Sequence, residues 1–125
     1  MRLVLDSDPR LYLVRSYGEG AVVVGEQSLT RPCIVSPLQL LPDWPARSIA
    51  ELDESQMQPL LALGAGIVLL GAGSTQPFPS NALRALCRAR GVALECMNLG
   101  AACRTYNILA NEQRSVVAGL FPGEP

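Results

Sequence analysis

The 125-residue sequence contains no histidine, and all ten of its basic residues are arginine, so lysine is absent too. Without histidine there is no imidazole to act as a general base or metal ligand, and without lysine no Schiff base can form. Aromatic residues make up 5% of the chain and the net charge is −1. A nucleic-acid partner is therefore not expected, because neither a basic surface nor a set of stacking rings is present.

Long apolar runs and closely spaced cysteines are missing as well. No apolar stretch approaches the roughly 20 residues of a membrane-spanning helix, so we expect no membrane insertion. Acidic residues at positions 6 and 8 come too early for a secretory signal. The four cysteines, at positions 33, 87, 96 and 103, lack the spacing of a zinc site or a redox C-x-x-C motif. We expect a cytoplasmic protein with reduced thiols, no metal site and no cofactor.

The stretch from Gly66 to Cys96 organises the chain. Residues 67–70 form a short apolar run between glycines, which is typical of a strand covered on both faces. Ser80 is a candidate helix cap, and Gly91 has the place of a left-handed helix end. A second strand is expected at 92–96. The pattern predicts two parallel strands joined by a helix.

The remaining elements are predicted from turn and proline signals. Further strands are expected at 11–16, 21–24, 28–30, 33–36 and 115–120, and helices at 48–63 and 101–112. Capping-box spacing places the firm start of the first helix near Ser55. Trp44 lies in a proline-rich segment, where it either packs on the sheet or anchors a partner. We expect a flexible leader at 1–9, one domain at 10–121 and a flexible tail at 122–125.

Two loops are expected at the carboxyl ends of parallel strands, where ligands tend to bind in such sheets. One is the glycine loop 71–77, and the other is 97–100, which leads into a helix. The candidate ligand-binding residues are Gly71, Gly73, Ser74, Thr75, Gln76, Cys103, Arg104, Tyr106 and Asn107. Backbone amides after the glycines can cradle an anion. The glycines equally suit a tight turn, because the loop matches neither a P-loop nor a complete dinucleotide fingerprint.

Cys103 is expected in the first turn of the last main helix, beside Arg104. A helix N-terminus and a neighbouring cation favour the thiolate, which would make this cysteine reactive. The small residues around it favour the alternative, close helix packing. No histidine is present to act as its base, so we expect no catalytic residues.

Three segments together resemble a known family. They are Val-Leu-Leu-Gly-Ala-Gly at 68–73, Ala-Ala-Cys-Arg-Thr-Tyr-Asn-Ile-Leu at 101–109, and Glu112-x-Arg114. They resemble the Mth-type domain of unknown function, family 498, which includes complex I assembly factor 3 type and adipogenesis-associated domain proteins. The resemblance runs over roughly residues 10–121. It implies a single three-layer α/β domain with a mixed sheet, a β-rich, hammerhead-like N-terminal half and a C-terminal β-α-β-α-β portion.

The resemblance implies no established catalytic activity. We therefore expect a non-enzymatic role in protein binding or assembly, with a protein partner. The alternative is a small-molecule or anion-binding domain, an enzyme included, that uses the 71–76 loop and the helix start at 103–107. A homodimer is left open.

Overall fold

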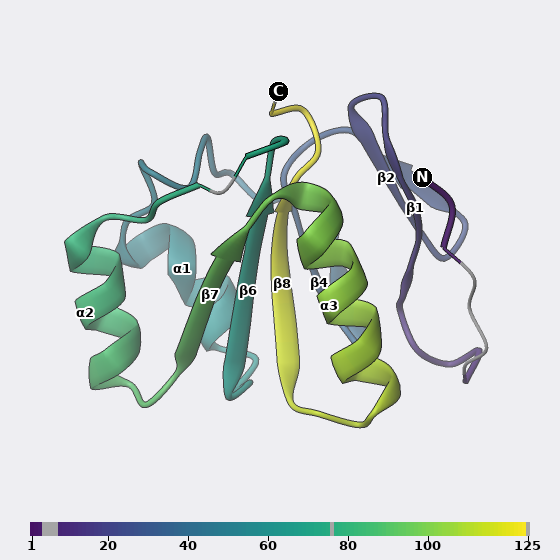
Figure 1. Ribbon diagram of the computed structural model, residues 1–125. Helices are drawn as coiled ribbons and strands as arrows, with labels where there is room; N and C mark the ends of the chain where they lie inside the picture. Colours follow the sequence, from purple (N-terminus) through teal and green to yellow (C-terminus); the bar gives the residue numbers. More distant parts are fainter. Residues whose placement is uncertain (4–7, 76, 125) are drawn as a thin grey trace.

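The computed structural model describes residues 1–3, 8–75 and 77–124. They form three layers, of which the central sheet is the middle one (Figure 1). The strands are β1 (Val14–Gly18), β2 (Ala21–Val24), β3 (Gln27–Leu29), β4 (Cys33–Ser36), β5 (Gln39–Leu41), β6 (Ile67–Ala72), β7 (Ala93–Met97) and β8 (Val116–Phe121). The helices are α1 (Glu54–Leu61), α2 (Asn81–Ala89) and α3 (Leu99–Asn111).

The central sheet has five strands in the order β5-β4-β8-β6-β7. β6 is parallel to both β7 and β8, whereas β4 is antiparallel to β8 and to β5. β1, β2 and β3 form a separate antiparallel sheet of three strands. The mixed sheet, the β-rich first half and the parallel β6-α2-β7 unit are confirmed.

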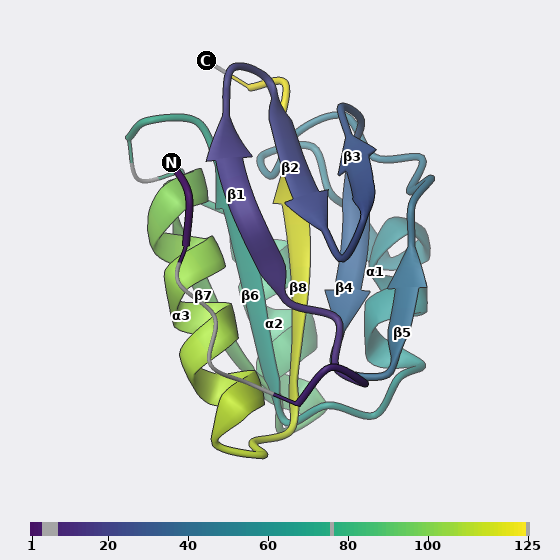
Figure 2. The ribbon, with the colours of Figure 1, turned by 90° about the vertical axis from the view of Figure 1, so that its right-hand side faces the viewer.

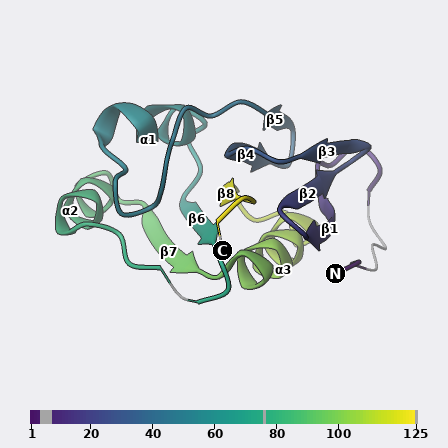
Figure 3. The same cartoon turned by 90° about the horizontal axis from the view of Figure 1, so that it is seen from above.

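α1 and α2 cover one face of the central sheet, and α3 and the small sheet cover the other (Figures 1 and 3). Val68 and Leu70 of β6 belong to a core shared with α1 and α2, and Leu69 belongs to a core shared with α3 and β1–β3. Successive side chains of a strand point to opposite faces, so β6 is apolar at each of these positions. β8 is buried along its whole length for the same reason.

Two helices begin at caps that the sequence analysis did not identify. α1 starts after Asp53, whose carboxylate accepts a hydrogen bond from the Gln56 N–H at 2.9 Å, while Gln56 Oε1 accepts one from the Asp53 N–H at 3.2 Å. This capping box shortens the expected 48–63 helix at its start. α3 starts after Asn98, whose Oδ1 accepts from the Ala101 N–H at 2.8 Å. The expected helix start at 101 is therefore two residues late.

Trp44 is a core residue. Its side chain is 2% exposed, its Nε1 donates to the Gln56 carbonyl at 2.8 Å, and its ring centroid lies 5.1 Å from that of Phe121. A Cβ on Gly119 would come within 2.7 Å of the indole, so this glycine makes room for it. The expectation that Trp44 packs on the sheet is confirmed, and its alternative as a partner anchor is wrong.

The three-stranded sheet lies beside α3, over β8 and β4 (Figure 2). Residues 1–3 run next to β1, where Arg2 forms a bridge with Ser16. Residues 4–7 of the expected leader and residue 125 of the expected tail lie outside the described residues. The division into leader, domain and tail stays a prediction.

Candidate functional site

The structure brings the two predicted loops together at the carboxyl ends of β6 and β7. The Leu99 N–H, at the start of α3, donates to the Gly73 carbonyl at 3.0 Å. The Ala101 N–H is bonded to the Asn98 side chain. A helix N-terminus attracts anions through the backbone N–H groups of its first turn that have no partner within the chain. The Leu99 and Ala101 amides are already used within the chain, which leaves fewer donors for an anion.

The two glycines of the first loop have different roles. A Cβ on Gly71 would lie 2.3 Å from the Cβ of Ala102, so glycine at this position lets α3 lie directly on β6. Gly73 has a φ of +67°, in the left-handed region that glycine enters freely. The Ser74 and Thr75 side chains that follow are exposed. Gln76, the fifth candidate in this loop, lies outside the described residues.

Tyr106 and Asn107 join α3 to the first strand. The Asn107 Nδ2 donates to the Val14 carbonyl at 2.8 Å, and its Oδ1 accepts from the Val14 N–H at 2.9 Å. The Tyr106 hydroxyl donates to the Tyr12 carbonyl at 2.7 Å. Both side chains are buried. Their polar atoms therefore meet the backbone of residues 12–14 and not the solvent.

Cys103 lies in the second turn of α3, so its expected place in the first turn is wrong. Its side chain is fully buried, and burial raises the pKa of its thiol to about 12. The neighbouring Cys33 raises the pKa further, and Arg104 lowers it by less. Desolvation thus outweighs the nearby cation, which favours the neutral thiol at physiological pH. Close packing, the alternative given above, agrees with this environment.

Arg104 is exposed, unlike the three other candidates on α3. Its Nη1 donates to the Tyr17 hydroxyl, and its Cζ lies 5.9 Å from the centroid of the Tyr17 ring. The ring rests on Gly100, where a Cβ would come within 2.8 Å of it. Ile108 follows Arg104 by one helical turn and is 58% exposed. We call Tyr17, Arg104 and Ile108 the α3 patch.

Tyr17 and Ile108 were not among the candidates from the sequence. Tyr17 lies between the strands expected at 11–16 and 21–24, and Ile108 belongs to the resembling segment at 101–109, where no role was assigned to it. The signal that was available is the i, i+4 spacing of Arg104 and Ile108 in a helix whose opposite face is apolar. The contact with Tyr17 crosses 87 residues and had no local signal.

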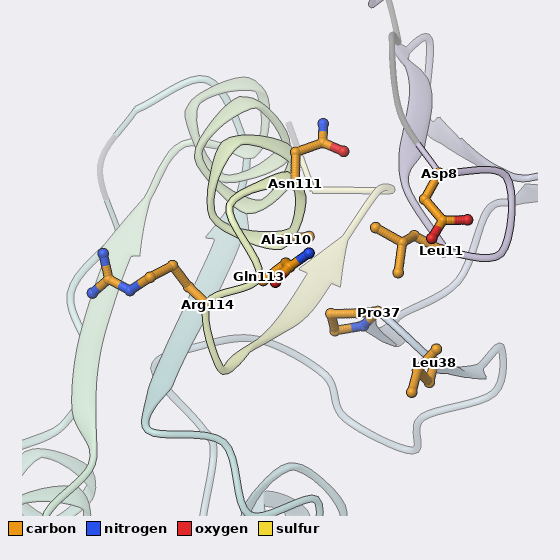
Figure 4. Close-up of a pocket in the computed structure, with 8 residues that line it drawn as sticks. All are labelled: Asp8, Leu11, Pro37, Leu38, Ala110, Asn111, Gln113 and Arg114. Atoms are coloured by element: carbon orange, nitrogen blue, oxygen red, sulfur yellow. The ribbon is translucent and has the colours of Figure 1, made fainter.

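A cavity of about 410 Å³ lies at the other end of α3, near the start of β8 (Figure 4). It is lined by Asp8, Leu11, Pro37, Leu38, Ala110, Asn111, Gln113 and Arg114. Gln113 has a φ of +61°, which is uncommon for a residue with a side chain. The Asp8 carboxylate is paired with Arg10 at 2.6 Å, and this partner lowers its pKa to about 2. The Arg114 side chain extends away from Leu11 and Leu38 (Figure 4).

Neither a metal site nor a membrane-spanning helix is found in the described part of the chain. Its cysteine, aspartate and glutamate side chains form no group of three or more that could hold a metal ion. Residues 1–3, 8–75 and 77–124 also include no helix with the length and apolarity needed to cross a membrane.

Comparisons with known proteins give a consistent picture. A family model described as "Protein of unknown function (DUF498/DUF598)" matches residues 14–121. NADH dehydrogenase (ubiquinone) 1 alpha subcomplex assembly factor 3 of Bos taurus is 30% identical over 96% of this chain. This chain spans 66% of that protein, just under two thirds of its length.

Two solved structures extend the likeness to the fold. An NMR structure from Xanthomonas campestris has 37% identity and a TM-score of 0.83, over 97% of this chain and 93% of that one. A Bordetella pertussis protein described as a Mth938-like domain has 28% identity and a TM-score of 0.79, over 99% of this chain and 94% of that one.

Proposed function

The chain belongs to the DUF498/DUF598 family, as its resemblance predicted, and from this premise we propose that it acts in the cytoplasm by binding a protein partner, without catalysis. The naming of one relative as an assembly factor supports a role in building a larger complex. The observation that carries the proposal is the α3 patch, in which the exposed side chains of Arg104 and Ile108 follow each other on α3 and Arg104 contacts the half-buried Tyr17.

The composition of the α3 patch suits a protein interface. Arginine and tyrosine are enriched among the residues that dominate binding energy, and apolar side chains beside them exclude water. The Arg104 guanidinium is held over the Tyr17 ring by a hydrogen bond and a cation–π contact. An arginine that is already positioned loses less conformational freedom on binding.

The state of the cysteines supports a cytoplasmic location. Cys33, Cys87, Cys96 and Cys103 are all free thiols in the structure. Free thiols persist in compartments that are kept reducing, whereas disulfides dominate in secreted proteins.

Affinity capture with paired variants tests the proposal. The tagged wild type, Arg104→Ala/Ile108→Ala and a control, Arg84→Ala/Arg88→Ala, are expressed in the native cells. The control removes two exposed arginines with the same i, i+4 spacing from α2. We expect a stoichiometric partner with the wild type and the control. Recovery should fall at least tenfold for the α3 variant, since loss of one interface hot spot costs about 2 kcal/mol or more.

The result that overturns the proposal is equal recovery of the partner by the α3 variant and the control, or no stoichiometric partner for the wild type. Thermal unfolding of each variant checks that the fold is retained, which we expect because all four replaced side chains are exposed. Tyr106 is left intact, since it is buried and its removal would disturb the core.

A further inference from the structure

Two cavities adjoin at the end of α3 and form one groove. The cavity of about 410 Å³ shown in Figure 4 and a second cavity of about 270 Å³ share Pro37, Leu38 and Arg114 in their walls. The second cavity continues toward Leu63 and Ala65, which precede β6 in the chain. Ligand sites have volumes of roughly 300–1,000 Å³ and mainly apolar walls with a few polar groups. The groove has the size and the kind of wall that a small molecule needs.

The groove combines an apolar wall with one charge that has no partner. Leu11 and Leu38 line the first cavity, and the Leu38 side chain is 74% exposed. The Asp8 carboxylate, which also lines this cavity, is bonded through both of its oxygens to Arg10, at 3.0 and 2.6 Å. Arg114 forms no ion pair with any carboxylate of residues 1–3, 8–75 and 77–124. Because its side chain extends away from Leu11 and Leu38 (Figure 4), the charge and the apolar wall lie at different ends of the groove.

The turn after α3 holds a glutamine where glycine is favoured. The Gln113 N–H donates to the Ala110 carbonyl at 3.0 Å, and the Arg114 N–H donates to the Leu109 carbonyl at 2.9 Å, which are the two hydrogen bonds of a Schellman motif. The left-handed position of this motif is usually glycine, but here it is Gln113, with a φ of +61°. Uncommon backbone of this kind is concentrated at functional sites, where it positions a side chain.

The Gln113 side chain lines the first cavity, and Figure 4 shows it between the side chains of Arg114 and Leu11. The Schellman motif also fixes the direction in which the chain leaves α3, and with it the starting point of the Arg114 side chain. Glu112-x-Arg114, a segment of the family resemblance that the α3 patch does not use, is therefore the turn that builds this end of the groove.

We propose that the groove binds an aliphatic monocarboxylate, with its carboxylate on the Arg114 guanidinium, the Gln113 carboxamide beside it, and its hydrocarbon chain along Leu11 and Leu38. A guanidinium binds a planar carboxylate through two parallel hydrogen bonds. A monoanion matches the single unpaired charge of the groove. A phosphate carries roughly two charges at neutral pH, of which Arg114 would balance only one. The groove shares no residue with the α3 patch, so the inference is independent of the proposed function.

Titration of the purified full chain with octanoate, followed by the amide NMR signals of residues 110–115, provides the first test. We expect saturable shifts for the wild type and for Arg84→Gln, a control that changes an exposed arginine of α2. Arg114→Gln should bind octanoate about tenfold more weakly or worse, because the charge-assisted hydrogen bonds are lost. 1-Octanol, which lacks the charge, and acetate, which lacks the chain, should each bind more weakly than octanoate by a similar factor. Absence of shifts with octanoate, equal affinities of Arg114→Gln and Arg84→Gln, or equal binding of either analogue would overturn the inference.

Gln113→Gly separates a binding role of this side chain from a structural one. Glycine enters the left-handed region freely, so the replacement should raise the Tm. It also removes the carboxamide from the cavity and should weaken octanoate binding several-fold. A more stable variant with weaker binding is the expected result. An affinity equal to that of the wild type would overturn the inference, because the glutamine would then have no part in the site.

Discussion

Asn107 takes the place of a neighbouring strand at Val14, the first residue of β1, beyond the stretch of its outer edge that pairs with residues 1–3. Its side chain makes both hydrogen bonds that a paired strand residue would make to Val14, at 2.8 and 2.9 Å. Asn107→Ala leaves the Val14 N–H and C=O without partners, and Val14 is fully buried. Each buried, unsatisfied polar group costs about 1–3 kcal/mol. Because two groups are affected, the free energy of unfolding should fall by about 2–6 kcal/mol.

Urea denaturation followed by circular dichroism measures this loss, and hydrogen exchange at the Val14 amide localises it. In a domain of this size a loss of 3 kcal/mol lowers the Tm by roughly 10 °C. Asn111→Ala is the matched control, since Asn111 lies one turn further along α3 and is exposed. Its unfolding free energy should stay within about 0.5 kcal/mol of wild type. Equal effects of the two replacements would refute the role of Asn107 in holding β1.

Two further predictions concern the core. Gly71→Ala places a Cβ 2.3 Å from that of Ala102 and should lower the free energy of unfolding, measured in urea, by about 1–3 kcal/mol. In the control Gly66→Ala the new Cβ meets no atom within 4 Å, so the free energy of unfolding should hardly change. Equal urea midpoints for the two variants would contradict the close packing of α3 on β6. Burial raises the pKa of Cys33 and Cys103 from 9.0 to about 12, so the unfolded thiols ionise first and the free energy of unfolding falls as the pH rises from about 9 toward 12. A wild-type urea midpoint that is unchanged between about pH 8 and about pH 10 would argue against this burial, and Cys33→Ala/Cys103→Ala should reduce the dependence.

The β6-α2-β7 unit could be predicted because its signals are local. The apolar run in β6 reflects a strand covered on both faces, and Ser80 caps α2 through a hydrogen bond from the Leu83 N–H at 3.1 Å. Gly91 has a φ of +69°, as expected at a left-handed helix end. The caps Asp53 and Asn98 were missed, because several neighbouring side chains could serve as caps and the path of the chain selects among them.

The sequence predicted the helix that carries the α3 candidates, but not the direction in which their side chains point. Cys103, Tyr106, Asn107 and Ala110 follow an i, i+3, i+4, i+7 spacing, which is that of a buried helix face. Tyr106 and Asn107 were chosen as ligand-binding candidates for their polar atoms, and this role stays a prediction; in the structure these atoms bond to the backbone of residues 12–14. Their partners lie 94 and 93 residues earlier in the chain, and contacts of such length leave no periodic signal in the sequence.

The position of β8 has a consequence for the order in which the molecule can be built. Residues 116–121 occupy the place between β4 and β6, so the central sheet is divided until they are present. During translation, β5-β4 and β6-β7 are two separate ribbons, each with an open edge and uncovered apolar side chains. The contacts that join them are distant in sequence, and such contacts form slowly. We expect this domain to remain a client for chaperones until β8 has left the ribosome.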